Sequence, residues 1–364
     1  MIRVFESFAG YGSLTLALDE LNIEYELVGS SEIDADAIIA YGAIKGYDLM
    51  KFRMPSEIVN GLKVRGIVLK DYNSLRARMV YNACLGSNNF GDITKIVASN
   101  VPSMDLFSYT FPCTTISKAG LKTGLKEGSD TKSSLLWYCR DVIFQHKPKY
   151  LFMENVIDLL DTKFRDDFDA WLEWLEDLGY SNFYMKLSAD DFGVPQSRER
   201  LIMISVLDEH FVYQFPQRGT VDAKLIDYID TDVINEYSLT PAEKLALEEK
   251  GGVSLVGAVG VAYNPCSREF RGFKQACPTL CARDYKGPKI VAYSTPKGVV
   301  ARRLSSKEYW RLMGVKESYY AKCVQVGLSN SALYKLAGNS VVVHLIVGVL
   351  GELFKDYKNK KDNK

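Results

Sequence analysis

Short apolar runs alternate with helix-length segments over residues 1–208. The run IRVF at the start is followed by a Gly-rich turn, and then by a segment in which Leu14, Ala17, Leu18 and Leu21 fall on one helical face. The next segment, EYELVGSSEIDADAIIAYGAI, repeats the order of strand, acidic turn and helix, and further strands are predicted at MDLFSYTF, YLFMEN and LIMISV. This alternation predicts an α/β fold, a mostly parallel sheet with crossover helices on both faces.

The pattern changes after about residue 210, where short β-like pieces are cut by Gly and Pro. We therefore expect a catalytic domain over 1–208, a smaller lobe with its connecting segment over 209–329, and a return to the first domain over 330–364, including the polar tail KDYKNKKDNK. Residues 45–90 have helical character, and their sequence indicates no function.

Charge is distributed unevenly along a chain of 364 residues whose net charge is zero. Residues 264–303 hold nine Lys/Arg against two Asp/Glu, whereas residues 151–182 hold nine Asp/Glu against two Lys/Arg. The basic stretch suits contact with nucleic-acid phosphates, although an ordinary solvated face would have the same composition. The acidic stretch is typical of a solvated helix.

The seven cysteines form no CxxC pair, and no histidine lies near Cys277 and Cys281. This favours reduced thiols in a cytoplasmic protein without a metal site. The N-terminus has the pattern of a strand and lacks the features of a signal peptide. The longest apolar stretch, VVVHLIVGVLGELF, is expected to be too short and too interrupted to span a bilayer, so no membrane partner is predicted.

Glycines and carboxylates follow the first predicted strands, at the edge where parallel sheets bind ligands. Gly10-Tyr11-Gly12 follows the first strand and Glu32 the second, while Asp92 follows a Gly further along. Glu32 could accept both ribose hydroxyls of an adenosine, and Asp92 an adenine amino group; a helix-terminal charge and a turn-forming Asp are the alternatives. The turn lacks both the third Gly of a dinucleotide fingerprint and a phosphate-loop Lys, which favours S-adenosylmethionine (SAM).

A second set of polar residues has the chemistry of nucleophilic catalysis. Cys113 follows an apolar run and a Pro and precedes a Gly- and Lys-rich segment. Glu154 ends the next strand as a candidate acid, and Arg198 and Arg200 precede LIMISV, where alternation predicts one common face. Each residue has an alternative explanation when it is taken alone. Cys113 could be a core thiol, Glu154 a charge at a strand end, and the two arginines members of a surface salt bridge.

Six ordered motifs resemble those of the cytosine-C5 DNA methyltransferase family. They are ESFAGYGS, FPCTTIS, MENV, FGVPQSRERLIMI, RRLSSKEYWRLMGV and AGNSVVVHL. The resemblance spans residues 2–350 apart from 45–90 and 210–275. One departure is Thr114, where the family usually has Gln after Pro-Cys, and the long 45–90 stretch is similar to that of some bacterial enzymes acting on CG-containing sites.

The resemblance implies a role for each candidate. Cys113 would attack C6 of a cytosine flipped out of the duplex, Glu154 would protonate N3, Arg200 would grip O2 and Arg198 would steady the site. The SAM pocket, which would release S-adenosylhomocysteine as product, would be lined by Phe8, Ala9, Gly10, Tyr11, Gly12, Glu32, Asp92, Ile93, Pro112, Asn339 and Ser340.

The resemblance also implies double-stranded DNA as the partner of a monomeric enzyme located near the nucleoid. A lid beginning at Cys113, and the target-recognition lobe, would contact DNA through Ser117, Lys118, Lys122, Thr279 and Arg283. A cognate restriction endonuclease could act on the same DNA sites without direct contact. Alternatives are a cytosine-C5 methyltransferase acting on tRNA, an inactive SAM- or DNA-binding protein and, less well supported, a nicotinamide dehydrogenase or an amino-methyltransferase.

Overall fold

Contacts divide the chain into two compact units. In a computed structural model, the described residues are 1–116, 125–129, 131–217, 219, 223–231, 237–243, 245, 249, 261–264, 269–273, 276–296, 298–355 and 357. The first unit comprises Met1–Leu187, Glu199–Gln217 and Ile346–Lys364, and the second comprises Ser188–Arg198 and Arg218–Leu345. These units divide the chain at other positions than the predicted segments 1–208, 209–329 and 330–364, which stay a prediction.

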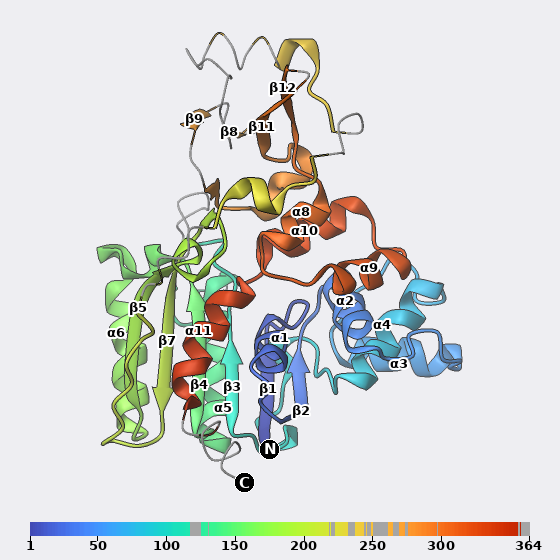
Figure 1. The fold of residues 1–364 in the computed structure, drawn as a ribbon. Helices are drawn as coiled ribbons and strands as arrows, with labels where there is room; N and C mark the ends of the chain where they lie inside the picture. Colours follow the sequence, from blue (N-terminus) through green and yellow to red (C-terminus); the bar gives the residue numbers. More distant parts are fainter. Residues whose placement is uncertain are drawn as a thin grey trace. The chain divides into compact units, whose positions relative to one another are not determined.

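The first unit is built on a six-stranded sheet (Figure 1). Its strands, in spatial order, are β2 (Tyr25–Ser31), β1 (Ile2–Ser7), β3 (Leu106–Tyr109), β4 (Tyr150–Asn155), β7 (Glu199–Val206) and β5 (Ser181–Ser188). Strands β2, β1, β3 and β4 run parallel to one another, whereas β7 is antiparallel to its neighbour β4. The predicted α/β class with a mostly parallel sheet is confirmed.

Helices connect the strands as the alternating pattern predicted. They are α1 (Ser13–Glu20), α2 (Ala35–Lys45), α3 (Pro55–Val64), α4 (Leu75–Gly86), α5 (Cys139–His146) and α6 (Thr162–Asp177), with short 3₁₀ helices η1 (Ile93–Lys95), η2 (Ala98–Asn100), η3 (Ser133–Tyr138) and η4 (Ile157–Leu160). The stretch 45–90 thus contains α3 and α4. Helix α3 begins with Pro55, a residue suited to a position that needs no N–H donor, and the Glu57 side chain accepts from the Met54 N–H at 3.0 Å.

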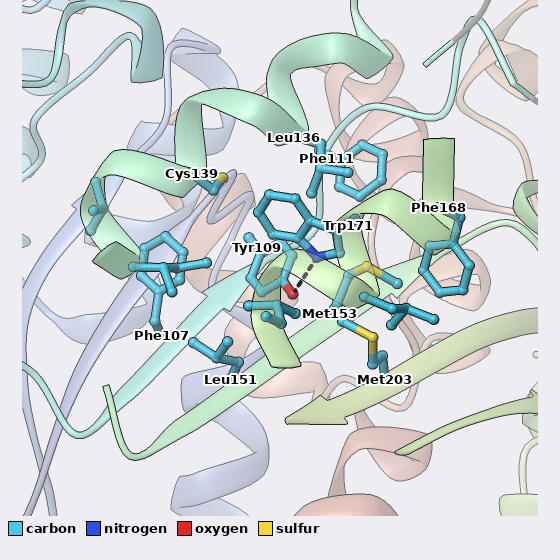
Figure 2. Packing of buried hydrophobic residues seen from close by; sticks show 14 of the residues in the cluster. Phe107, Tyr109, Phe111, Leu136, Cys139, Leu151, Met153, Phe168, Trp171 and Met203 are labelled. Carbon is cyan, nitrogen blue, oxygen red and sulfur yellow. Dashed lines mark hydrogen bonds between the residues drawn. The ribbon is translucent and has the colours of Figure 1, made fainter. Parts of the chain in front are cut away.

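Alternation along the central strands buries both faces of the sheet. Leu106 and Phe107 are adjacent in β3 and therefore point to opposite faces, yet neither has measurable exposure. On one face, Tyr109 packs with Trp171 of α6, whose indole N–H donates to the Tyr109 hydroxyl at 3.3 Å (Figure 2). Because both faces of the sheet are buried, polar side chains that could meet a ligand are expected at the ends of its strands.

Helix α6 contains most of the acidic stretch 151–182. Its apolar side chains Phe164, Phe168, Trp171, Leu172 and Leu175 are buried. Among its acidic side chains, Asp166, Glu173, Glu176 and Asp177 are exposed. The prediction of a solvated helix is therefore confirmed for α6.

The second unit consists of small β elements followed by helices. They are η5 (Ala189–Phe192), β6 (Gln196–Ser197), η6 (Leu225–Tyr228), β8 (Val261–Asn264), β9 (Glu269–Phe273), β10 (Cys277–Pro278), η7 (Ala282–Lys286), β11 (Ile290–Thr295), β12 (Gly298–Arg303), α8 (Ser306–Arg311), α9 (Glu317–Gln325) and α10 (Asn330–Asn339). Strands β8 and β9, and likewise β11 and β12, form antiparallel pairs, while β6 and β10 are parallel. Helix α11 (Val343–Leu353) leads from this unit back into the first.

The apolar stretch VVVHLIVGVLGELF overlaps a longer apolar segment. By length and composition alone, Asn330–Leu353 would suffice to cross a membrane. However, 67% of its most apolar window is buried inside the protein. Burial of this kind is typical of a core helix.

A buried ion pair organises the second unit. The Arg302 guanidinium contacts both carboxylate oxygens of Glu308, at 2.6 and 2.9 Å, and both side chains are fully buried. The same carboxylate accepts from the backbone N–H groups of Asp230 and Ser305 at 2.8 and 2.6 Å. Ser305 also caps α8 by accepting from the Glu308 N–H. Arg302 and Glu308, which belong to the motif RRLSSKEYWRLMGV, therefore stabilise the fold of the second unit.

Candidate active site

The turn after β1 requires glycine at two positions. Gly10 and Gly12 have φ values of 56° and 89°, in the left-handed region. Gly12 is also the N-cap of α1, and a Cβ atom there would lie 2.7 Å from the ring of Tyr41. The turn therefore packs closely on α2, and a side chain at position 12 would displace Tyr41.

Glu32 follows β2, as predicted, and reaches the glycine turn. Its Oε2 accepts from the Gly10 N–H at 2.9 Å, and its Oε1 accepts from the Ile33 and Asp34 N–H groups at 2.8 Å each. Burial raises the pKa of this carboxyl group, while these backbone donors oppose the rise. A carboxylate that holds both the turn and its own loop is well fixed to receive a ligand at the same edge.

Glu6 lies beneath this turn, and sequence reasoning missed it. Its carboxylate is 2% exposed, accepts from the Tyr41 hydroxyl at 2.6 Å and accepts from the Thr15 N–H at 3.3 Å. Burial raises its pKa, with the Tyr41 hydrogen bond acting in the opposite sense. The available signal was an acidic residue inside an otherwise apolar strand, which is costly unless it is partnered.

Asp92 caps the short helix η1. Its Oδ1 accepts from the N–H and the hydroxyl of Thr94, at 3.0 and 2.9 Å. This geometry corresponds to the turn-forming alternative, and a carboxylate can accept further hydrogen bonds beside it. Ile93, the following residue, is buried. Their contact with adenine stays a prediction.

Cys113 lies beyond the end of β3, in a segment tied to its neighbours. The Thr110 hydroxyl donates to the Phe8 carbonyl at 3.2 Å, which links this segment to the glycine turn. The Asn155 side chain at the end of β4 donates to the Phe111 carbonyl at 3.0 Å. Cys113 itself is half-buried, and Thr114, which replaces the family's usual Gln, is exposed.

Most other described cysteines are unreactive by environment. Burial raises the pKa of Cys84, Cys277 and Cys323 to about 12, and Cys139 is also fully buried with a raised pKa. Nucleophilic attack needs a thiolate, and thiols of this kind do not supply one near neutral pH. Partial exposure distinguishes Cys113 from these four.

Glu154 and Arg200 form an ion pair at one end of the sheet. Residue Glu154 pairs with Ile202 across the antiparallel β4 and β7, which brings the start of β7 beside the end of β4. The Arg200 Nε lies 2.9 Å from Glu154 Oε1, and the two side chains are 13% and 11% exposed. The guanidinium thus holds the carboxyl group while part of both remains open to a ligand.

The prediction that Arg198 and Arg200 share one face assumed a single strand containing both, and that assumption was wrong. Strand β7 begins only at Glu199, and the alternation argument does not extend back past the start of the strand. Arg198 is 3% exposed and donates to the backbone carbonyls of Leu280, Gly338 and Ser340, at 2.7, 3.2 and 2.7 Å. Its hydrogen bonds therefore stabilise the fold of the second unit.

Gln196 and Thr279 extend the contacts made by Arg198. The Gln196 amide accepts from the Leu280 N–H at 3.1 Å and donates to the Leu312 carbonyl at 2.7 Å. The Thr279 hydroxyl donates to the Ser197 carbonyl at 2.7 Å. The hydroxyl proton of Thr279 is therefore already used within the protein. The predicted DNA contact of Thr279 would have to use another part of the residue.

The remaining predicted residues are distributed over both units. Asn339, at the end of α10, is exposed, and the Ser340 hydroxyl donates to the Leu336 carbonyl at 2.8 Å. Both belong to the second unit, and their part in a cofactor site stays a prediction. Ser117, Lys118 and Lys122 lie outside the described residues.

The basic stretch 264–303 exposes less charge than its composition indicates. Arg302 is paired with Glu308, and Lys289 lies 3.4 Å from Asp284 with both side chains buried. Arg283 is exposed on η7, together with the neighbouring Lys286. The count of basic residues therefore overstated the surface charge, while Arg283 is accessible as predicted.

The glycine turn and Glu32 fit the adenosine-containing ligand expected from the sequence, because the Glu32 carboxylate, which accepts from the Gly10 N–H, has the acceptor chemistry that ribose hydroxyls require. Within the described ranges, no cluster of three His, Cys, Asp or Glu side chains is arranged to hold a metal ion. An α/β sheet with a glycine turn, a strand-end cysteine and an Arg-held carboxyl group agrees with the methyltransferase class that the six sequence motifs indicated.

Comparison with known proteins identifies the family. Residues 58–355 match the family described as C-5 cytosine-specific DNA methylase. The type II methyltransferase M2.ScrFI of Lactococcus lactis subsp. cremoris is 37% identical over 98% of this chain and 99% of its own length. The orphan methyltransferase M.SssI of Spiroplasma monobiae is 30% identical over 97% of each chain. The chain belongs to the cytosine-C5 DNA methyltransferase family.

Solved structures agree with this fold. The crystal structure of the S. pombe Dnmt2 methyltransferase matches with a TM-score of 0.68 at 17% identity, covering 98% of this chain and 99% of that one. A putative DNA modification methyltransferase of an E. coli prophage matches with a TM-score of 0.60 at 15% identity, over 98% and 100% of the two chains. The family match confirms the resemblance seen in the six motifs and the enzyme class, and these structures confirm the fold.

Proposed function

We propose that the protein methylates C5 of one cytosine within a specific double-stranded DNA site, through a covalent bond between Cys113 and C6. The observation that carries this proposal is the Arg200–Glu154 pair at the strand ends beside the half-buried Cys113 segment. The family membership supplies the reaction class, and DNA is the substrate that it implies.

The residues divide the chemistry among them. The Cys113 sulfur forms a bond to C6 while Glu154, oriented by Arg200, donates a proton to N3, so that negative charge does not accumulate on the ring. C5 then accepts the methyl group. Transfer of the C5 proton to water, return of the N3 proton to Glu154 and cleavage of the S–C6 bond then restore the aromatic ring and release Cys113 as the thiolate. Stacked bases hide C5 and C6, so the target cytosine must leave the helix.

The methyl donor in this reaction is SAM, which supplies an electrophilic methyl group when bound. Glu32 and the Gly10–Gly12 turn would hold its adenosine part, with Asp92 as a further acceptor and Phe8 and Pro112 beside them. Glu32→Ala should weaken SAM binding by about 1–3 kcal/mol, the scale for losing a charged acceptor. Unchanged affinity by calorimetry would remove Glu32 from the site.

Contacts with DNA would come from both units. Arg283 and Lys286 are exposed on η7, and the stretch that follows Cys113 adds further lysines. We take the enzyme to act as a monomer in the cytoplasm, and a restriction endonuclease recognising the same site would need no contact with it. Raising the salt concentration should weaken DNA binding steeply, because such lysines and arginines release counterions from the phosphates.

The deciding experiment uses DNA with 5-fluorocytosine at a methylation site mapped by bisulfite sequencing. Fluorine at C5 cannot leave as the proton does, so with SAM present the protein should remain joined to DNA in denaturant through Cys113. Cys113→Ala should bind SAM normally and form no adduct. Absence of any adduct with the unchanged enzyme on the mapped site would reject the covalent mechanism.

A parallel assay with tRNA addresses the alternative substrate. Methyl transfer to DNA but not to tRNA is the expected result, because the description of the matched family names DNA as the substrate. A faster reaction on tRNA would reverse the assignment of substrate while leaving the Cys113 chemistry intact.

A further inference from the structure

The chain on both sides of residues 117–124 is anchored in the core. Ile116, on the side of Cys113, and Leu125, on the other side, have no measurable exposure and belong to the same hydrophobic cluster. The Leu125 carbonyl also accepts from the Trp137 indole N–H at 2.8 Å. The backbone that leads to Cys113 is therefore held at defined points, and the question is what fixes the cysteine itself.

A buried pair of hydroxyl groups lies next to Cys113. Ser133, at the start of η3, is fully buried, and its hydroxyl donates to the Pro112 carbonyl at 2.7 Å. The same oxygen accepts from the Thr115 hydroxyl at 2.6 Å, while the Ser133 N–H donates to Thr115 Oγ1 at 3.2 Å. Three hydrogen bonds thus join a residue after the loop to residues on either side of Cys113.

These bonds fix the two peptide planes around Cys113. Because a peptide unit is planar, holding the Pro112 carbonyl sets the plane that contains the Cys113 nitrogen. The Cys113 carbonyl accepts from the Ile116 N–H at 3.0 Å, which holds the plane on the other side. With both planes fixed, the Cα–Cβ bond of Cys113, and hence the path of its sulfur, has a set direction.

We propose that Ser133 is a positioning residue, which with Thr115 aims the Cys113 thiol at C6. The inference rests on the proposed function, because it takes Cys113 as the nucleophile. Neither hydroxyl group touches the substrate in this account. Their effect is on geometry, and a misplacement of about 1 Å at a reacting atom can cost on the order of a hundredfold in rate.

Ser134 provides a matched control for Ser133. It is 4% exposed, and its hydroxyl donates to the Thr131 carbonyl at 2.8 Å. Ser133→Ala and Ser134→Ala therefore each remove one buried hydroxyl from adjacent positions, but only the first releases Pro112. At Thr115, Thr115→Val removes the hydroxyl and keeps the shape, whereas Thr115→Ser keeps the hydroxyl.

The test measures single-turnover methylation of mapped duplex DNA, with SAM and DNA affinities determined separately. Ser133→Ala and Thr115→Val should lower the rate about 10- to 100-fold with both affinities unchanged, as expected for a misdirected nucleophile. Ser134→Ala and Thr115→Ser should retain the rate. The double variant should be no slower than the worse single variant, because both changes break the same network.

Alkylation of Cys113 by iodoacetamide, followed by peptide mass spectrometry, reports on the thiol without catalysis. Ser133→Ala should change its rate relative to Ser134→Ala. Equal methylation and alkylation rates in those two variants would overturn the inference. If instead Cys113→Ala still methylates DNA, the proposed function fails, and this result is distinct from a neutral Ser133→Ala in an enzyme that needs Cys113.

Discussion

Two arginine–glutamate pairs in this molecule have similar geometry and different surroundings. Arg302 and Glu308 approach to 2.6 Å in the second unit with both side chains fully buried, and Arg200 and Glu154 approach to 2.9 Å in the first unit with about a tenth of each side chain exposed. In the first pair, two backbone N–H groups donate to the Glu308 carboxylate, and a backbone carbonyl accepts from the Arg302 guanidinium. The second pair lies where two strands end.

We propose that this difference separates a structural ion pair, Arg302–Glu308, from a catalytic one, Arg200–Glu154. A buried pair whose other hydrogen bonds are made to the backbone and to the Tyr293 hydroxyl has nothing left to offer a ligand, and removing one partner leaves an uncompensated charge. A pair at the end of a sheet keeps a polar surface for a substrate. The comparison predicts opposite responses of stability and catalysis to mutation of the two glutamates.

The largest effect is expected from Glu154→Gln. Methyl transfer should fall about 10²- to 10⁴-fold, because a neutral amide cannot donate the proton that N3 needs. The free energy of unfolding should fall less than for Glu308→Ala, since about a tenth of each side chain is exposed and the Gln amide can still accept a hydrogen bond from Arg200. Rapid-quench kinetics and urea denaturation measure the two quantities. A full-rate Glu154→Gln enzyme would contradict the acid role.

Glu308→Ala should have the opposite profile. Breaking a fully buried pair costs about 3–5 kcal/mol of stability, because Arg302 is left buried without its carboxylate. Urea denaturation, with tryptophan fluorescence as the signal, measures the loss. Replacing both partners by apolar residues of similar volume serves as the control and should recover much of the stability. A mild effect of Glu308→Ala would show that the network is not structural.

The two arginines of the QSRER motif give a smaller and more specific contrast. Arg198→Lys loses the forked donors that reach three backbone carbonyls, so stability should fall by about 1–3 kcal/mol. Arg200→Lys should cost less than about 1 kcal/mol in stability and more in methylation rate. Thermal denaturation and single-turnover rates of both variants test this. The reverse ranking of stabilities would restore a catalytic role to Arg198.

The smallest effect concerns the thiols. At pH 8 iodoacetamide should label Cys113 and the exposed Cys281, while Cys84, Cys277 and Cys323 stay unlabelled in the folded protein. Their pKa of about 12 leaves a thiolate fraction on the order of 10⁻⁴ at that pH, and burial blocks the reagent as well. Mass spectrometry of the labelled peptides gives the pattern. Labelling of Cys84 before Cys113 would contradict it.

The sequence predicted the sheet and the residues at its strand ends, because apolar runs followed by polar residues depend only on local order. Glu32 and Glu154 occur where the pattern placed them. The alternation argument failed for Arg198 because the chain leaves β6 at Ser197 and begins β7 at Glu199. A break of one residue between strands has no signature in the order of apolar and polar positions.

Contacts that the spacing of residues does not specify were the other limit. The partial burial of the basic stretch depends on Glu308 for Arg302 and on Asp284 for Lys289, and neither pairing follows from spacing. The Ser133–Pro112 bond likewise joins residues 21 positions apart, across a segment that reads only as polar and glycine-rich. Such contacts appear when the chain is folded and cannot be counted from composition.

The way in which the chain passes between the units bears on exchanging DNA specificity among related enzymes. Residues Ser188–Arg198 belong to the second unit although Glu199–Gln217 returns to the first. A transplant of residues 218–345 alone would leave behind Gln196 and Arg198, which hold the backbone at Leu280. A functional chimera must therefore carry two inserts from the donor enzyme, the short one included, and one crossover on each side of the long segment is not enough.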